Sequence, residues 1–209
     1  MSDTSYPVFQ RYGTAAQRAA FTPSPAAGTQ PIYEWYETDT DNLYIYTTAW
    51  KGPFAAATSS GRVKQVVNTQ TGAVATGTTQ IPLDDTIPQN TEGTEFMSLA
   101  ITPTNASNKL KIDVVFYCSN SGATTEIVAL FQDTTADALA ASSAFIDLAT
   151  ASIVIMFTYF MVAGTTSATT FKVRAGPNNA TTVSFNGQSG ARRFGGVASS
   201  SITITEIVP

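Results

Sequence analysis

The residue types that carry most enzyme chemistry are scarce in this chain of 209 residues, which contains no histidine and one cysteine. Histidine is the commonest general base in enzymes. Its absence also excludes a Ser-His-Asp or Cys-His arrangement and a histidine-ligated metal. The chain also lacks a Gly-Lys-Ser/Thr loop for a nucleotide phosphate and a Gly-x-Gly-x-x-Gly motif after a strand-like run. The sequence therefore predicts a protein that is not an enzyme, with no catalytic residue and no cofactor.

Carboxylates are the remaining groups that could do chemistry. Asp84 and Asp85 lie in a loop bounded by prolines, but adjacent residues of an extended chain point to opposite faces and do not converge on one substrate atom. The spacing Glu37-x-Asp39-x-Asp41 is similar to that of a calcium loop, although it lacks the required glycine and the bidentate glutamate. We expect Asp84 and Asp85 to lie in a solvated loop, and we expect no metal there or at Glu37-x-Asp39-x-Asp41.

The charge and the apolar runs limit the partners. A formal net charge of −4 disfavours nucleic acid, because phosphate binding needs clustered lysine and arginine. The adjacent pair Arg192-Arg193 lies in a glycine-rich turn, where we expect it to be solvated or paired with a carboxylate. Cys118 is predicted to be a small buried hydrophobe. The apolar run Ile153–Val162 has half of the roughly 20 residues that a membrane helix needs, so we interpret it as a buried strand and expect no membrane insertion.

The elements that must position any site are strands. Only 12% of the residues are charged, about half of the usual fraction, and Thr, Ser, Ala, Asn and Gly take their place. Leu110, Ile112, Val114 and Phe116 alternate with more polar residues, which is typical of half-buried antiparallel strands. Turn residues recur every 8 to 15 positions from residue 62 onward. The predicted strands are Val63–Thr71, Glu95–Ile101, Lys109–Tyr117, Thr125–Gln132, Ile153–Val162, Thr169–Ala175, Thr181–Phe185 and Ser199–Val208.

Eight strands in this length predict an all-β fold, an antiparallel β-sandwich that is jelly-roll-like, preceded by an extended hairpin module. The stretch 133–150 is the one part with helical character, since it is rich in alanine and carries Leu139, Ile146 and Leu148. Its Thr and Ser content also fits an excursion of a strand at the edge of a sheet, so both alternatives stay open.

The first fifty residues differ in composition from the rest. Two strand-like runs, Tyr33–Thr38 and Leu43–Thr48, flank an Asp/Asn-rich turn and predict a hairpin. Such a hairpin buries little by itself, so its aromatic residues need a partner surface. We expect residues 1–50 to be a docking module, 51–61 a linker and 62–209 the β-sandwich domain. The predicted docking residues are Phe9, Tyr12, Trp35, Tyr44, Tyr46 and Trp50.

Two stretches carry a family resemblance. Phe185-Asn-Gly187, Arg193-Phe-Gly-Gly-Val197 and Ser201-Ile-Thr-Ile-Thr-Glu-Ile207 resemble the ending of many tail-fibre and minor virion structural proteins of tailed bacteriophages. The same family typically has segments similar to Val63–Val67, to Ser98–Pro103 with Asn108–Ile112, and to Ala129–Asp133. The pieces follow the same order over residues 62–207. At the N-terminus, Gly13–Arg18, Tyr36–Thr40, Leu43–Tyr46 and Trp50 look like a small hairpin module of phage appendage proteins.

The resemblance implies a structural protein of the virion, assembled in the host bacterial cytoplasm and homotrimeric. In a three-fold assembly the strand Ile153–Val162 and the Thr/Ser-rich faces could be shared between chains. The implied role is a tail-fibre or spike component in assembly and host attachment, and the alternative is a capsid decoration (cement) or head-fibre protein. Copy number per virion would separate the two.

The expected partners are the chain itself, other virion structural proteins, and a host cell-surface glycan or protein. The residues predicted to lie in receptor-facing loops are Asn178, Asn179, Asn186 and Gln188. Plain turns are the alternative interpretation of these positions.

Overall fold

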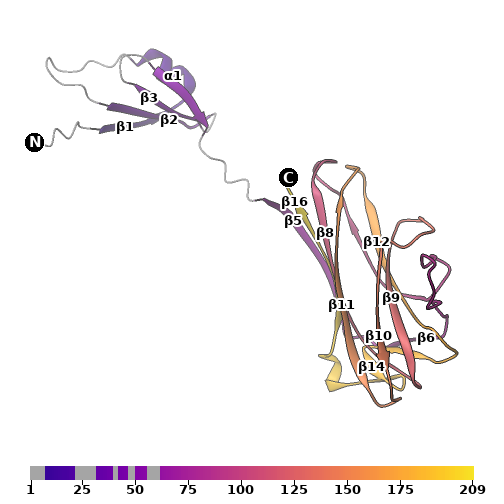
Figure 1. The fold of residues 1–209 in the computed structure, drawn as a ribbon. Helices are drawn as coiled ribbons and strands as arrows, with labels where there is room; N and C mark the ends of the chain where they lie inside the picture. Colours follow the sequence, from indigo (N-terminus) through magenta and orange to yellow (C-terminus); the bar gives the residue numbers. More distant parts are fainter. Residues whose placement is uncertain (1–7, 22–31, 40–41, 47–49, 56–61) are drawn as a thin grey trace, which may run out of the picture. The chain divides into compact units, whose positions relative to one another are not determined.

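The computed structural model describes residues 8–21, 32–39, 42–46, 50–55 and 62–209. The chain divides into two compact units (Figure 1), which we call the first unit, residues 1–60, and the second unit, residues 61–209. Each unit is described by itself below.

The first unit is a four-stranded sheet with one short helix. Its strands follow the order β1-β2-β3-β4, with β1 and β2 parallel and the other pairs antiparallel. The elements are β1 (Val8–Gly13), α1 (Ala15–Ala20), β2 (Ile32–Glu37), β3 (Asn42–Tyr46) and β4 (Trp50–Ala55).

The helix α1 begins at a capping box. The Thr14 hydroxyl accepts a hydrogen bond from the Gln17 backbone N–H, and the Gln17 side chain accepts one from the Thr14 backbone N–H. Both bonds satisfy donors that a helix N-terminus leaves unpaired. The Asp39 carboxylate accepts a further bond from the Ala15 backbone N–H, at 3.0 Å, where a negative charge is favourable.

The predicted hairpin is present as β2 and β3, which pair in register Tyr33 to Tyr46. Two further strands and the helix were not expected from the sequence. β1 precedes the predicted hairpin in the sequence, and β4 takes up residues 50–55. The first half of the segment expected to be a linker is therefore part of the sheet. Position 53 is a proline, which cannot donate to a ladder, and β4 lies at the edge of the sheet, where proline is tolerated.

The second unit is an antiparallel β-sandwich, as predicted from the sequence. One sheet has the order β10-β9-β12-β7; the other has β5-β16-β8-β13-β6, with β11 pairing along the other side of β8. The long strands are β5 (Val63–Thr71), β7 (Thr94–Ile101), β8 (Lys109–Asn120), β9 (Thr124–Gln132), β10 (Ala140–Ile146), β11 (Ser152–Val162), β12 (Thr169–Pro177) and β16 (Ser200–Ile207). The short elements are β6 (Ala75–Gly77), β13 (Val183–Phe185), β14 (Gly187–Gln188), β15 (Ala191–Arg192) and the 3-10 helix η1 (Phe194–Gly196).

The main core lies between the two sheets. Alternate residues of each strand point inward, and the period of two seen in the sequence produces this face. Phe96, Phe116 and Phe185 form an aromatic cluster with ring centroids 5.0 to 5.6 Å apart. The largest fully buried members of the core include Phe116, Phe171, Leu110, Ile112, Leu130, Ile146, Ile202 and Ile204.

A second, smaller core lies on the outer side of β9. Ile127, Ala129 and Phe131 point away from the main core and pack against Ile81, which is fully buried. The segment that carries Ile81 is held to the sheet by backbone bonds to Pro177 and from Gly93. β9 is consequently apolar on both faces, which explains its nearly continuous hydrophobic sequence.

The stretch 133–150 contains the edge strand β10, which pairs antiparallel with β9 from Ala140 to Ile146. Of the two alternatives for this stretch, the helical one is wrong and the edge-strand one is confirmed. Alanine-rich composition is a weak predictor, because pairing with a neighbouring strand overrides helix propensity.

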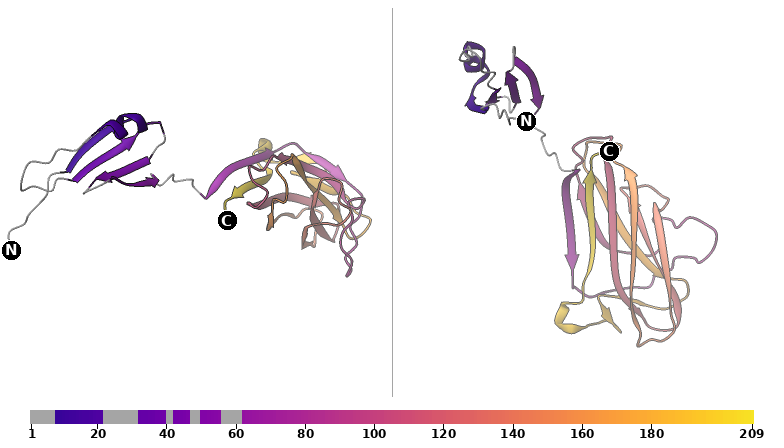
Figure 2. Two further views of the ribbon diagram at one scale, coloured as in Figure 1. Left: turned by 90° about the horizontal axis from the view of Figure 1, so that it is seen from above. Right: turned by 60° about the vertical axis from the view of Figure 1, so that its left-hand side comes forward.

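The expectation that Ile153–Val162 is a buried strand is half correct. β11 is a strand, but it lies at the side of its sheet, and every second side chain faces outward. Figures 1 and 2 show the arrangement of the second unit along its strands. The start of β5 and the C-terminus lie at one end, and the loop between β14 and β16 lies at the opposite end, which we call the distal end.

Candidate functional site

The outer face of β11 carries a stripe of apolar side chains. β11 pairs with β8 along its length, so that Met156 lies opposite Val115 and Phe160 opposite Lys111. Odd-numbered residues point toward the core, where Ile155 is buried and the others are half-buried. Even-numbered residues point outward, because successive side chains of a strand alternate between faces.

These outward side chains are large and exposed. Met156 is 65% exposed and Phe160 56% exposed, and Val154 and Val162 are exposed to a similar degree. Val115 and Tyr117 of β8 lie opposite Met156 and Val154 and are half-buried. We call the set Val154, Met156, Phe160, Val162, Val115 and Tyr117 the β11 face. A contiguous apolar area of this kind is typical of an interaction surface.

A polar cluster interrupts the β11 face near its middle. The Thr158 hydroxyl donates to the Asp113 carboxylate at 2.6 Å, and the Lys111 ammonium donates to the other carboxylate oxygen at 2.6 Å. Burial alone would raise the pKa of Asp113, but the hydrogen bonds from Lys111 and Thr158 lower it overall. The carboxylate stays charged and is matched by Lys111, and the exposed Lys109 opposite Val162 adds one positive charge at the end of the face.

The edge of β11 is also open. Within the described part of the chain β11 pairs with β8 and with no strand on its other side. Its backbone N–H and C=O groups on that side can pair with another chain. No charged residue lies between Ser152 and Val162 to prevent such pairing.

The sheet of the first unit has two faces with different surroundings. On one face Trp35 is buried, 5.6 Å from Phe21, and Glu37 is buried and paired with Arg18 at 2.6 Å. The Arg18 guanidinium also lies 3.8 Å from the centroid of the Tyr44 ring, a cation–π contact. This face forms the small core of the unit.

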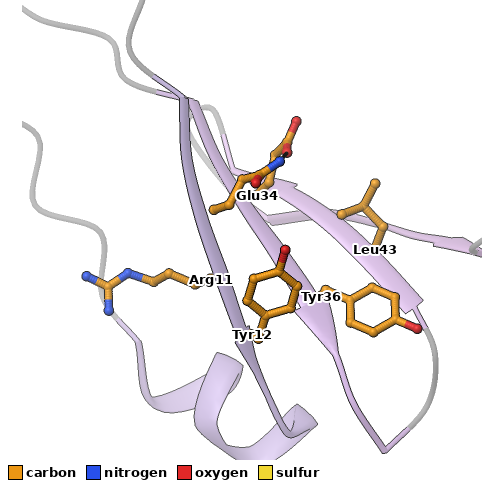
Figure 3. Close-up of a pocket in the computed structure, with 6 residues that line it drawn as sticks. Arg11, Tyr12, Glu34, Tyr36 and Leu43 are labelled. Carbon is orange, nitrogen blue, oxygen red and sulfur yellow. Dashed lines mark hydrogen bonds between the residues drawn. The ribbon is translucent and has the colours of Figure 1, made fainter.

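The opposite face is open. Tyr12 and Tyr36 lie edge to face with ring centroids 6.1 Å apart, and Tyr12 is 70% exposed. The Gln10 amide donates to the Glu34 carboxylate at 3.0 Å beside them. A hollow of about 220 Å³ lies here (Figure 3), with Leu43 on its far side.

Arg11 points away from the two tyrosine rings in Figure 3. Its guanidinium lies 4.4 Å from the centroid of the Phe21 ring on the other face. The open face therefore combines two aromatic rings, an amide and a carboxylate, and its net charge is negative.

The structure separates the residues predicted for docking. Tyr12 is on the open face, whereas Trp35 is a core residue of the first unit and has almost no surface to offer a partner. Tyr44 and Tyr46 are half-buried and lie on the same side of the sheet as Trp35, since they pair with Trp35 and Tyr33. Phe9 lies in β1 and Trp50 in β4, but their side chains fall outside the described residues. Tyr36 was not predicted, although its alternation with Trp35 could have placed it on the open face.

The residues predicted for receptor-facing loops also differ. Asn179 is exposed, and its amide donates to the Ala123 carbonyl. Asn178 is half-buried; its side-chain oxygen accepts from the Thr125 backbone N–H at 3.0 Å. Both side chains stabilise the turn between β12 and β13.

Asn186 is fully buried, which removes it from any receptor-facing surface of this fold. Its amide donates to the carbonyls of Thr71 and Ala73, and its oxygen accepts from the Ser200 hydroxyl at 2.7 Å. The residue thus ties three chain segments together. Gln188 is partly exposed and links the Thr150 carbonyl to the Arg193 guanidinium.

Several of the candidate chemical groups of the sequence have structural partners. The Asp84 carboxylate accepts from the backbone N–H and the hydroxyl of Thr86, and these bonds lower its pKa. Glu37 and Asp39 bind Arg18 and the start of α1, and Asp41 lies outside the described residues. Cys118 is buried, and burial raises the pKa of its thiol.

Within the described ranges there is no group of three or more Cys, Asp or Glu residues that could hold a metal ion. In the same ranges no helix is long and apolar enough to cross a membrane.

Two buried glutamates escaped the sequence analysis. Glu206 accepts hydrogen bonds from Asn108 at 2.6 Å, from Gln65 at 2.6 Å and from the Thr104 backbone at 2.8 Å. Burial opposes the charged form, but these bonds, the one from Asn108 foremost, lower the pKa of Glu206 to about 2. Glu206 thereby fastens the loop before β8 to the last strand.

Glu126 is buried in the main core, where the Asn120 amide donates to one of its oxygens at 2.5 Å. The other oxygen has no hydrogen-bond partner among the described residues. Burial raises the pKa of Glu126 to about 8, and the bond from Asn120 offsets this only in part.

Comparisons with known proteins give matches among solved structures alone. No family model matches the chain, and no curated protein matches it. Among solved structures, a Podospora anserina GH26-CBM35 β-(1,4)-mannanase is 15% identical with a TM-score of 0.32, covering 69% of this chain and 28% of that one. The enzymatically active domain of the bacteriophage CBA120 tailspike protein 4 is 13% identical with a TM-score of 0.27, covering 69% and 20%.

The similar structures also include viral capsid assemblies. The structure of infectious bursal disease virus, Gt strain, is 13% identical with a TM-score of 0.36, covering 90% of this chain and 43% of that one. The chain thus spans less than half the length of each of these proteins. At such identities and TM-scores the likenesses define neither a family nor a function for it.

Proposed function

We propose that this protein is a structural component of the virion of a tailed bacteriophage, a tail-fibre or spike subunit that works by assembly and attachment without catalysis. The observation that carries the proposal is the β11 face, an exposed apolar surface on a sheet that is otherwise rich in Thr and Ser. The resemblance of residues 62–207 to phage tail-fibre proteins supports the same role.

The occupant of the β11 face is a second copy of the chain, in a closed ring of three. At the centre of the face Lys111 neutralises Asp113, so no net charge there repels a second copy of the chain. Each copy carries the apolar stripe and the open edge on the same strand, β11. One copy can therefore cover the stripe of its neighbour, while the third copy of the chain covers the stripe of the first. Such head-to-tail contacts form a closed ring when the rotation between neighbouring copies is a simple fraction of a full turn.

The first unit provides the attachment to the rest of the particle. Its open face carries Tyr12 and Tyr36, and tyrosine gives a large contact area together with a hydrogen-bonding group. The neighbouring Glu34 carboxylate adds negative charge and selects a partner with a neutral or basic surface. Within the proposal this partner is another structural protein of the virion.

Sedimentation velocity of the purified chain tests the assembly. The wild type is expected to sediment as a species near 66 kDa, three times the chain mass of 22.0 kDa. Met156→Asp is expected to sediment as a monomer, because a carboxylate in the centre of the interface would be buried without a partner.

The matched control is Leu83→Asp, which introduces the same charge at a similarly exposed apolar residue on the other side of the second unit. It is expected to remain trimeric. A wild type that is monomeric at micromolar concentration, or a Leu83→Asp variant that dissociates as fully as Met156→Asp, would contradict the proposal.

A further inference from the structure

The loop between β14 and β16, residues 189–198, projects from the distal end of the second unit and is the most strained segment described. Phe194 has a φ of 49°, and Gly195 and Gly196 follow with φ of 64° and 92°. A bulky residue rarely adopts a positive φ. Strain of this kind persists where the surrounding structure imposes it, and it is common at binding sites.

The side chains of this loop, which we call the distal tip, are presented to solvent. Phe194 is 74% exposed and Val197 82% exposed, the two largest exposures among the large hydrophobic residues described. Arg192 and Arg193 are exposed beside them. Leu148, in the loop that Gln188 binds through Thr150, adds another exposed apolar side chain.

The base of the distal tip is rigid. Gly187 accepts a hydrogen bond from the buried Ser119 hydroxyl, and the Gly190 backbone N–H donates to the Ser184 hydroxyl at 2.8 Å. A Cβ at Gly72 would overlap the Gly196 carbonyl, so the tip also packs tightly against the end of β5. With the buried Asn186 below them, these contacts hold the tip in one conformation before any partner binds.

The charge of the distal tip is opposite to that of the chain. The protein has a net charge of −4, yet no Asp or Glu occurs between residues 148 and 205. Neither Arg192 nor Arg193 forms an ion pair among the described residues. Arg193 donates to the Gln188 side chain at 2.7 Å, which leaves the rest of its guanidinium available.

We propose that the distal tip is a binding site for an acidic polysaccharide. The guanidinium groups of Arg192 and Arg193 pair with its carboxylates, since a planar guanidinium matches a carboxylate with two parallel hydrogen bonds. Phe194 packs its ring against the apolar face of a sugar ring, and Val197 extends that contact. The positive charge selects an anionic chain, and the exposed aromatic ring selects one built of sugar rings.

The inference rests on the proposed function, since it assigns host attachment to one end of the second unit. The distal tip lies at the end of the second unit opposite the start of β5, the strand that follows the first unit in the sequence (Figures 1 and 2). A ring of three chains presents three such tips, and their combined binding gains through effective concentration.

Biolayer interferometry with the full-length chain tests the site, with three immobilised polymers as probes. Polygalacturonate offers carboxylates on sugar rings, poly(glycerol phosphate) offers negative charge without rings, and dextran offers rings without charge. The wild type is expected to bind polygalacturonate at least tenfold more tightly than either of the other two. The double variant R192A/R193A is expected to lose at least tenfold in affinity, and F194A is expected to remove the preference for polygalacturonate over poly(glycerol phosphate).

The matched control is R62A/K64A, which removes two exposed positive charges from the opposite end of the second unit. It is expected to bind polygalacturonate like the wild type. No saturable binding of the wild type to polygalacturonate, or an equal loss in the control, would overturn the proposal.

Sedimentation velocity of the same samples separates the two proposals. The tip variants are expected to have the oligomeric state of the wild type, because none of the substituted side chains belongs to the β11 face. A monomeric wild type that still binds polygalacturonate through Arg192 and Arg193 would contradict the proposed trimer and support the proposed binding site.

Discussion

Two buried glutamates of the second unit show how the environment of a single residue decides its charge. Glu206 is surrounded by donors and stays ionised, whereas Glu126 has one donor and an apolar surround, which favours its protonated form. Neither side chain has exposed surface, but Glu126 lies deeper in the protein than Glu206, so burial opposes its charge more strongly. The difference therefore lies both in depth and in the number of hydrogen bonds that the surrounding loops and strands provide.

Glu126 predicts a loss of stability in alkaline solution. Its folded-state pKa of about 8 lies above the ordinary value of 4.5, so the folded state binds a proton that the unfolded state releases. The free energy of unfolding should fall as pH rises from 4.5 to 8, by on the order of 3 kcal/mol. Glu126→Gln should remove most of this fall. Urea unfolding of both proteins at pH 5 and pH 8.5 measures it; equal slopes with pH would show that Glu126 does not titrate in this range.

Glu206 predicts the opposite behaviour in acid. Its folded-state pKa of about 2 lies below the ordinary value, so its contribution is complete above pH 4.5 and disappears as pH falls through 2. Glu206→Ala should destabilise the second unit at pH 7 by on the order of 2 kcal/mol, because donors of Asn108, Gln65 and Thr104 lose their acceptor. The destabilisation should shrink as pH approaches 2. Thermal unfolding from pH 2 to 7 tests this, and a constant difference would contradict it.

At the scale of elements, alternation in the sequence predicted the strands of the second unit well. β5 has the predicted bounds, and β8, β9, β11, β12 and β16 differ from the prediction by a few residues at an end. Their side chains repeat every two residues because each strand has one face in the core. The short strands β6, β14 and β15 could not be predicted, since two or three residues carry no period.

The candidate sites were predicted less completely. The β11 face was visible as an apolar run, but its exposure follows from the absence, among the described residues, of an element packed over that face of the sheet, which is a property of the topology. Trp35 and Tyr12 lie in neighbouring strands but on opposite faces of the sheet, and only the face of Trp35 is covered, with Phe21 beside its ring. Asn186 was predicted to be a loop residue, but the meeting of β5, β14 and β16 turns it into a core residue.

A pair of substitutions in β16 tests the assignment of its two faces. Ile204 is fully buried and Thr203 is partly exposed on the other face. Ile204→Ala should lower the free energy of unfolding by about 3 kcal/mol, because the cavity adds to the lost burial. Thr203→Ala should cost less than about 1 kcal/mol. Urea denaturation measures both, and similar costs at the two positions would mean that the register of β16 differs from the one described.

At the scale of the whole molecule, assembly and stability should be linked. If three chains share the β11 face, the unfolding temperature of the wild type should rise with protein concentration, because association draws on the folded state alone. Met156→Asp should abolish this dependence on concentration, whereas Leu83→Asp should keep the wild-type trend. Differential scanning fluorimetry over a hundredfold range of concentration makes the comparison, and a concentration-independent wild type would argue against a shared interface.

The pairing of β5 with β16 has a consequence for how the protein is made. Asn68 donates to the Thr203 hydroxyl across a separation of 135 residues, and β8 lies against β16 as well. The central sheet therefore cannot close until the ribosome has released the residues that form its last strand. Folding that depends on contacts so distant in the chain is slow. Until then the nascent sheet has unpaired strand edges. A chaperone that shields these edges during synthesis would favour correct folding.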